Sequence, residues 1–94
     1  VAQDDAEAVK WYRKAAEQDY ADAQLNLGVM YRLGEGVVQD YVRAHMWLNL
    51  AASAGDADAR EARDAIAGDM TQEQIAEAQR LAREWQAQHQ QPTP

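Results

Sequence analysis

A repeat of 36 residues constrains the fold of this chain more than any other feature of its sequence. When residues 1–24 are aligned with residues 37–60, ten of the 24 positions are identical, from Val1 and Val37 to Ala23 and Ala59. Periods of roughly 20–50 residues are typical of stacked structural repeats, in which each unit completes its core against its neighbours. The match decays further along the chain, which predicts a degenerate terminal copy.

The register of the repeat places the first residue inside a repeat. Val1 aligns with Val37, which follows the Gly34-Glu35-Gly36 segment. We therefore expect the C-terminal end of a longer array, although a chain that simply starts at a helix is the alternative. The expected single repeat domain spans 1–94 and divides into the second helix of a truncated upstream repeat (1–20), a full repeat (21–56), a degenerate terminal repeat with a capping helix (57–89) and a disordered tail (90–94).

Apolar residues recur with a period near 3.6 along almost the whole chain, which predicts helices and no strands. The helices are expected at about 5–18, 21–33, 41–53, 58–67 and 72–89. Asp4 and Asp40 are predicted N-caps, and Gly34 is a predicted left-handed C-cap. Thr71 and Gln74 have the spacing of a capping box. The loops are short, so consecutive helices are expected to be antiparallel neighbours.

Large apolar side chains are scarce, because 20 of the 44 apolar residues are alanine. Alanines let helix axes approach closely, and each tryptophan can then fill the space beside a small partner. We expect Trp11, Trp47 and Trp85 to be buried, with Trp11 and Trp47 in equivalent positions one repeat apart. Trp11→Ala is therefore expected to unfold the chain or nearly so.

Charge and composition exclude several classes of function. The formal net charge is -7, which disfavours nucleic acid and anionic membrane surfaces as partners. The chain has no cysteine, so disulfides, thiolate zinc sites and cysteine nucleophiles are excluded. No apolar run approaches the roughly 18 residues of a membrane span.

Residues that could carry catalysis or hold a metal are few. Ser53, the single serine, lies eight residues after His45 on one predicted helix, about 12 Å away by helical rise. His45 has no acidic residue three or four positions later, so we expect it at the surface or in a groove and not as a base or ligand. We predict no catalytic, metal or cofactor residues. Ion pairs at i,i+4 spacing are expected at Asp56–Arg60, Arg60–Asp64 and Arg80–Glu84.

The stretch from Ala21 to Tyr31 resembles the first helix of a tetratricopeptide repeat, with Leu27-Gly28-x-x-Tyr31 in the expected places. Gln24 stands where that pattern has tryptophan. The longer loop from Gly34 to Asp40, with Trp47 and the pair Ala51-Ala52, resembles the Sel-one-like repeat family, a close relative. This resemblance covers about residues 1–68.

The resemblance implies an all-α fold: an α-solenoid of antiparallel helix pairs wound into a right-handed superhelix, with five helices and a C-terminal capping helix. It also implies a non-enzymatic protein–protein interaction scaffold, or adaptor, that needs no cofactor and holds a protein or peptide on its concave face. Carried over to matched positions, the partner-binding residues are Asp22, Leu25, Asn26, Val29, Arg32, Asp58, Glu61 and Ala65. Leu25 and Val29 are apolar and lie off the predicted core stripe, which agrees with such a groove.

Three alternatives remain beside the adaptor. Flanking helices of an intact array could cover these residues. Some bacterial relatives are associated with peptidoglycan or with β-lactam turnover, although no motif here supports that role. The chain could also be only a structural C-terminal cap, which would then self-associate through its open N-terminal face.

Overall fold

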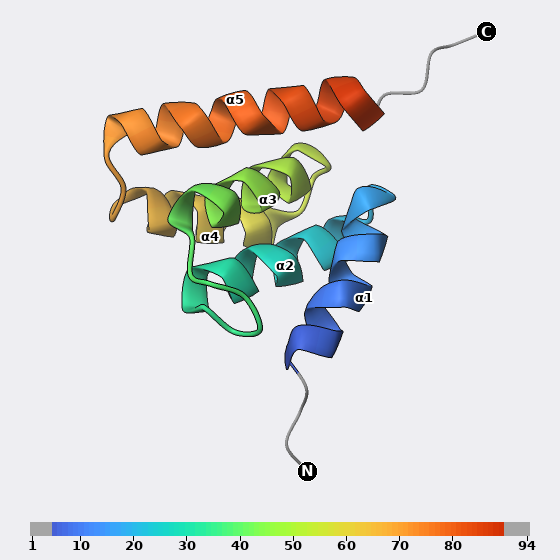
Figure 1. The fold of residues 1–94 in the computed structure, drawn as a ribbon. Helices are drawn as coiled ribbons and strands as arrows, with labels where there is room; N and C mark the ends of the chain where they lie inside the picture. The colour runs from blue at the N-terminus through green and yellow to red at the C-terminus, as the bar shows by residue number, and fades with distance from the viewer. Residues whose placement is uncertain (1–4, 90–94) are drawn as a thin grey trace, which may run out of the picture.

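The computed structural model describes residues 5–89, which form five helices and no strand (Figure 1). The helices are α1 (Asp5–Glu17), α2 (Ala21–Leu33), α3 (Tyr41–Ser53), α4 (Ala57–Ala67) and α5 (Gln72–His89). These bounds confirm the predicted helices to within about a residue. The predicted Asp4 cap and the 90–94 tail lie outside the described residues.

Polar caps fix the ends of the helices where the sequence predicts them. The Asp40 carboxylate accepts a hydrogen bond from the Arg43 N–H at 3.1 Å, so Asp40 caps α3. At the start of α5, the Gln74 N–H donates to Thr71 Oγ1 at 3.1 Å, and the Thr71 N–H donates to Gln74 Oε1 at 2.9 Å. This reciprocal pair confirms the capping box. Gly34 ends α2 in the left-handed conformation, with φ 72°.

The first four helices pack in chain order, each against the next, as expected of a helical repeat solenoid. The α2–α3 contact is tight because Gly28 has no side chain. A Cβ at Gly28 would lie 2.8 Å from Leu48 Cγ and 3.2 Å from the Ala44 carbonyl oxygen. Small residues at this crossing allow the two helix axes to come close, and Leu27 and Leu48 fill the core on either side.

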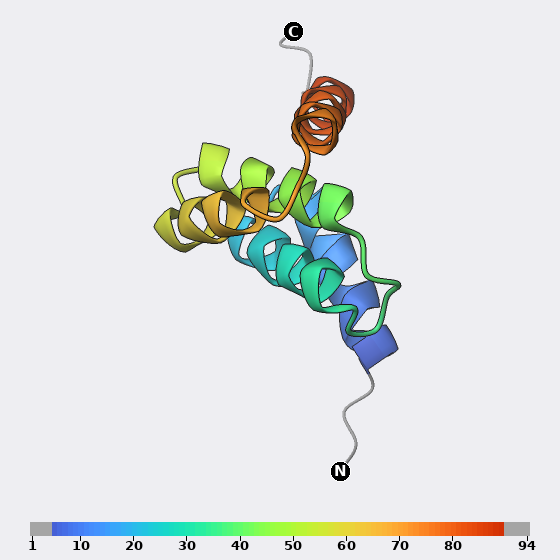
Figure 2. The same cartoon turned by 90° about the vertical axis from the view of Figure 1, so that its left-hand side faces the viewer.

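Helix α5 departs from this order, because it packs on α3 and makes little contact with α4. Figure 2 shows α5 nearly end-on, standing apart from the layer that the other four helices form. The expectation that consecutive helices are neighbours therefore holds from α1 to α4 and is wrong for α4 and α5. As a result α3 is covered by α2, α4 and α5 together.

The three tryptophans do not share one environment, and the predicted burial of Trp11 is wrong. Trp47 is 6% exposed, whereas Trp11, one repeat earlier, is 65% exposed. Helix α1 packs mainly on α2, so none of the other described helices covers the side of α1 that carries Trp11. The indole is instead approached by the Lys14 ammonium, 5.6 Å from the ring centroid. The fold therefore buries an alanine-rich core around α3 and leaves an aromatic side chain on α1 at the surface.

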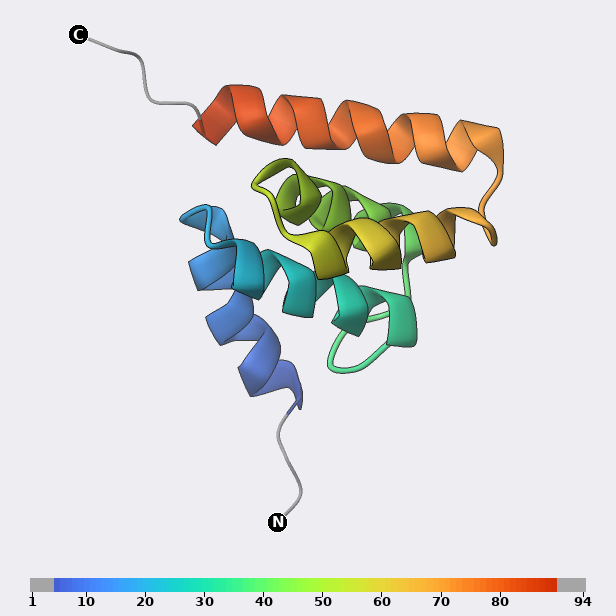
Figure 3. The ribbon, with the colours of Figure 1, turned by 180° about the vertical axis from the view of Figure 1, so that it is seen from behind.

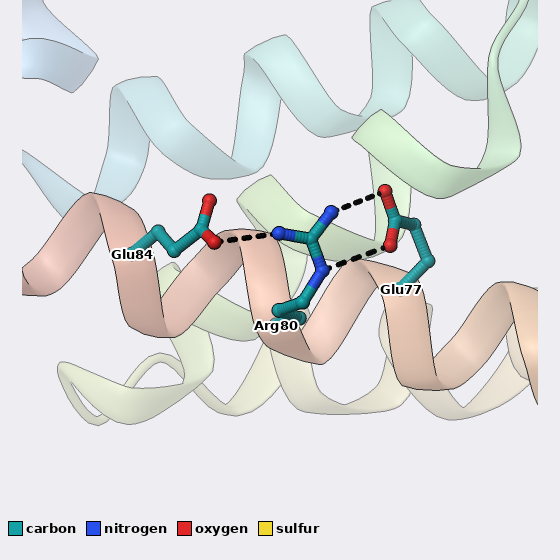
Figure 4. A network of polar contacts seen from close by, with 3 residues as sticks. All are labelled: Glu77, Arg80 and Glu84. Carbon is teal, nitrogen blue, oxygen red and sulfur yellow. Dashed lines mark hydrogen bonds and ion pairs between the residues drawn. The ribbon is translucent and has the colours of Figure 1, made fainter.

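Surface ion pairs follow the sequence only in part. Arg80 bonds to Glu84 at 2.5 Å, as predicted, and also to Glu77 at 2.7 Å (Figure 4). Neither predicted pair of Arg60 forms. The Asp56 carboxylate accepts from the Ala59 N–H at 3.0 Å as the cap of α4, and Asp64 pairs with Arg63 at 3.2 Å. The partners expected for Arg60 are thus engaged elsewhere.

Candidate functional site

Of the two residues that could carry catalysis, Ser53 is hydrogen-bonded within its own helix and His45 is buried. The Ser53 hydroxyl donates to the Asn49 carbonyl oxygen at 2.9 Å, within its own helix. His45 is 3% exposed, so the prediction that it lies at the surface or in a groove is wrong. It is buried because α3 is covered on several sides. Within residues 5–89, no group of three or more His, Cys, Asp or Glu side chains is placed to hold a metal ion.

The environment of His45 disfavours its charged form. Burial lowers the pKa of His45 below the ordinary value of 6.5, and the positive charge of Arg63 lowers it further, while Asp64 acts in the opposite direction. Among residues 5–89, its Nδ1 has no hydrogen-bond partner. A buried neutral imidazole of this kind fits a place in the core between helices.

The eight predicted partner-binding residues lie on two neighbouring helices, α2 and α4, which Figure 3 shows side by side. We call this surface the α2–α4 face. Its exposed members are Asp22, Asn26, Asp58, Glu61 and Ala65. Its half-buried members are Leu25, Val29 and Arg32. The assignment of these residues to a partner remains a prediction.

One member of the α2–α4 face already has a place within the fold. Leu25 packs against the small cluster of buried alanines formed by Ala51, Ala52 and Ala59, and also against the main core. Leu25, which lies off the predicted core stripe, therefore contributes to packing within the molecule. Only the part of the Leu25 side chain that stays exposed is available to a partner on the α2–α4 face.

A hollow of about 600 Å³ adjoins the α2–α4 face at its α1 end. It brings Asp22 and Asn26 of the predicted set together with two exposed aromatic side chains, Trp11 and Tyr20. We call this the aromatic hollow; its full lining is Trp11, Tyr12, Ala15, Tyr20, Ala21, Asp22, Ala23 and Asn26. The Asn26 side-chain amide donates to the Asp22 carbonyl oxygen at 2.8 Å, which holds the polar rim in place.

Gln24 fixes the turn between α1 and α2 that carries Tyr20. Its buried side-chain amide donates to the Ala16 carbonyl oxygen at 3.1 Å and to Asp19 Oδ1 at 3.3 Å. Asp19 has φ 70°, a left-handed conformation that these bonds help to hold. The substitution of glutamine for the tryptophan of the tetratricopeptide pattern thus has a structural use in the α1–α2 turn.

Sequence reasoning missed Trp11 and Tyr20 as surface residues. Trp11 was assigned to the core because it repeats at Trp47. A usable signal was the flanking Lys10 and Lys14, which mark a solvated side of α1. Tyr20 stands at the N-cap of α2, where its side chain makes no capping hydrogen bond and is 60% exposed.

Comparisons with known proteins agree with this architecture. The Sel1 repeat model matches residues 1–20 and 21–56. The fold is similar to the crystal structure of a protective antigen present in uropathogenic Escherichia coli strains, which displays an SLR fold. The TM-score is 0.89 and the identity 33%, over 95% of this chain and 19% of that one. The chain thus spans about a fifth of that relative's length. No curated protein matched the sequence.

One further finding concerns membranes. Within the described part of the chain, each helix is too short or too polar to span a bilayer.

Proposed function

The chain belongs to the Sel1 repeat family, and on that premise we propose that it is a non-enzymatic adaptor that binds a partner protein or peptide on the α2–α4 face. Sel1 repeats generally form protein–protein interaction scaffolds. The aromatic hollow is the proposed anchor point, and the rest of the face provides the polar surroundings.

The observation that carries this proposal is the exposure of Trp11 and Tyr20 beside a hollow. Trp11 is 65% exposed and Tyr20 is 60% exposed. Tryptophan and tyrosine are the residues most enriched among those that dominate binding energy at interfaces, and they act best in pockets bordered by polar groups. Asp22 and Asn26 supply that border.

The charges of the α2–α4 face define the chemistry of the partner. Asp22, Asp58 and Glu61 are exposed carboxylates, and Arg32 is the one basic member of the face. The net charge of the face is therefore negative. We expect a partner segment with basic residues next to an apolar or aromatic side chain that enters the hollow. A nucleic acid backbone would be repelled by this face and by the chain as a whole.

The proposal is tested by selecting peptides on the purified chain from a random peptide library and measuring the affinity of the selected peptides for variants. Trp11→Ala and Asn26→Ala, both at exposed positions, are expected to weaken binding, the first by about tenfold or more. Arg83→Ala, an exposed position on α5, is the matched control. Circular dichroism should be unchanged in all three. If the selected basic peptides bound the Trp11 and Asn26 variants as tightly as the parent chain, this surface would be ruled out.

A further inference from the structure

A second hollow, of about 580 Å³, lies where the C-terminal half of α5 passes over the rest of the molecule. Side chains from α1, α2, α3 and α5 line it, so residues from both ends of the chain meet there. We call it the α5 cleft and define it by Arg13, Tyr31, Arg43, Trp47, Trp85 and His89. It exists because α5 packs on α3 and not alongside α4.

Two arginines give the α5 cleft a positive character. The Arg13 guanidinium donates from Nη2 to the Tyr31 hydroxyl at 2.6 Å, which holds it against α2. Arg43 contributes a second guanidinium, whose side chain is 56% exposed and whose ion pair with Asp40 is loose at 3.5 Å. Among the residues that line the cleft, Glu17 is the one acid. Arg13 and Arg43 against Glu17 leave the lining with an excess of one positive charge, in a chain with a net charge of -7.

Aromatic rings form the other wall of the cleft, and their contacts hold them in fixed positions. Trp85 meets Trp47 edge to face, with ring centroids 5.8 Å apart. His89 stacks on Trp85, with centroids 3.9 Å apart and planes at 12°. The His89 Nδ1 lies 2.9 Å from the Trp85 carbonyl oxygen, which fixes the stack at the end of α5. A preformed apolar wall of this kind loses little freedom when a ligand binds.

We propose that the α5 cleft binds an acidic peptide segment, with its carboxylates on Arg13 and Arg43 and an aromatic side chain against Trp85. Guanidinium groups recognise carboxylates through paired, charge-assisted hydrogen bonds. The ring edge of Trp85 suits an edge-to-face contact with an aromatic ring of the ligand. This site is distinct from the α2–α4 face and takes a ligand of opposite charge, so one array could hold two partner segments at once.

The test uses tryptophan emission in a Trp11→Phe background, which leaves Trp47 and Trp85 as the reporters, both within the cleft. Two capped peptides are compared: one with a phenylalanine between two glutamates, and one with glutamines in their place. The glutamate peptide is expected to change the tryptophan emission in a saturable manner and to bind about tenfold or more tightly than the glutamine peptide. Its affinity should fall as the salt concentration is raised.

Arginine variants locate the binding. Arg43→Gln is expected to lower the affinity for the glutamate peptide by about tenfold, and Arg13→Gln should lower it by at least as much. Arg83→Gln is the charge-matched control and should have no effect. Arg13→Gln also removes the Tyr31 hydrogen bond, so circular dichroism accompanies it, and Arg43→Gln tests the site independently.

Several results would overturn the proposal. These are equal binding of the two peptides, equal binding by the arginine variants and the control, or an arginine-dependent response to a single-stranded oligonucleotide in place of the peptide. Substitution of Trp11 by alanine should leave the affinity of the α5 cleft for the glutamate peptide unchanged. Loss of binding at the aromatic hollow and loss at the α5 cleft are therefore separable.

Discussion

The indole of Trp47 meets the indole of Trp85 edge to face, with their planes at 71°. This contact joins α3 to α5, which are not consecutive helices. It closes the core over α3, and it forms one wall of the α5 cleft. Trp11 occupies the matching position in the repeat but has no such partner, and its exposure supplies the aromatic hollow.

The two repeat-related tryptophans should differ sharply in their contribution to stability. Trp47→Ala removes a buried indole and is expected to lower the free energy of unfolding by about 3–5 kcal/mol. Trp11→Ala removes an exposed one and should change it by no more than about 0.5 kcal/mol. Urea unfolding followed by circular dichroism measures both. Equal losses in the two variants would contradict the assignment of Trp11 to the surface.

Gly28 should tolerate no added methyl group. In Gly28→Ala the new Cβ would meet Leu48 Cδ2 at 2.9 Å, besides Leu48 Cγ, so α2 and α3 must move apart. We expect a loss of about 1–3 kcal/mol, which outweighs the gain in helix propensity. Gly68→Ala is the matched control, because its nearest neighbour would be a backbone oxygen at 3.4 Å and its φ is −62°. Thermal melting distinguishes them, and an unchanged midpoint in Gly28→Ala would refute the tight crossing.

The Thr71 hydroxyl of the capping box should contribute to the stability of the start of α5. Thr71→Ala removes the acceptor for the Gln74 N–H and is expected to cost about 1 kcal/mol. Thr71→Ser keeps a hydroxyl at the cap and should recover most of that loss. Chemical denaturation of the three proteins gives the comparison. If the serine variant were as unstable as the alanine variant, the hydroxyl would not be the cause.

His45 should make stability depend on pH. Its pKa is lowered in the folded protein, chiefly by burial, so the unfolded chain binds the proton more readily. The free energy of unfolding is therefore expected to fall as the pH drops below the ordinary value of 6.5 towards the lower folded value. Urea unfolding at two pH values, above and below this point, should show a smaller change in His45→Gln than in the parent.

Local signals in the sequence were sufficient to locate the helices. The 3.6-residue periodicity, the caps at Asp40 and Thr71 and the stop at Gly34 act within a turn or two of the chain, so they can be read without knowledge of the fold. The 36-residue repeat likewise indicated a helical solenoid, because stacked units must share a core. The positions on α2 and α4 that form the proposed binding face came from the resemblance to tetratricopeptide and Sel-one-like repeats.

Tertiary structure alone decided which of these side chains meet solvent. Trp11 and Trp47 are the same residue in the same repeat position, yet burial depends on whether another helix covers them, and only α3 is covered by α5. His45 became a core residue for the same reason. The α5 cleft joins Arg13 to His89 across most of the chain. Such a pairing depends on how the final helix packs, because packing sums weak contacts between distant segments that no local pattern encodes.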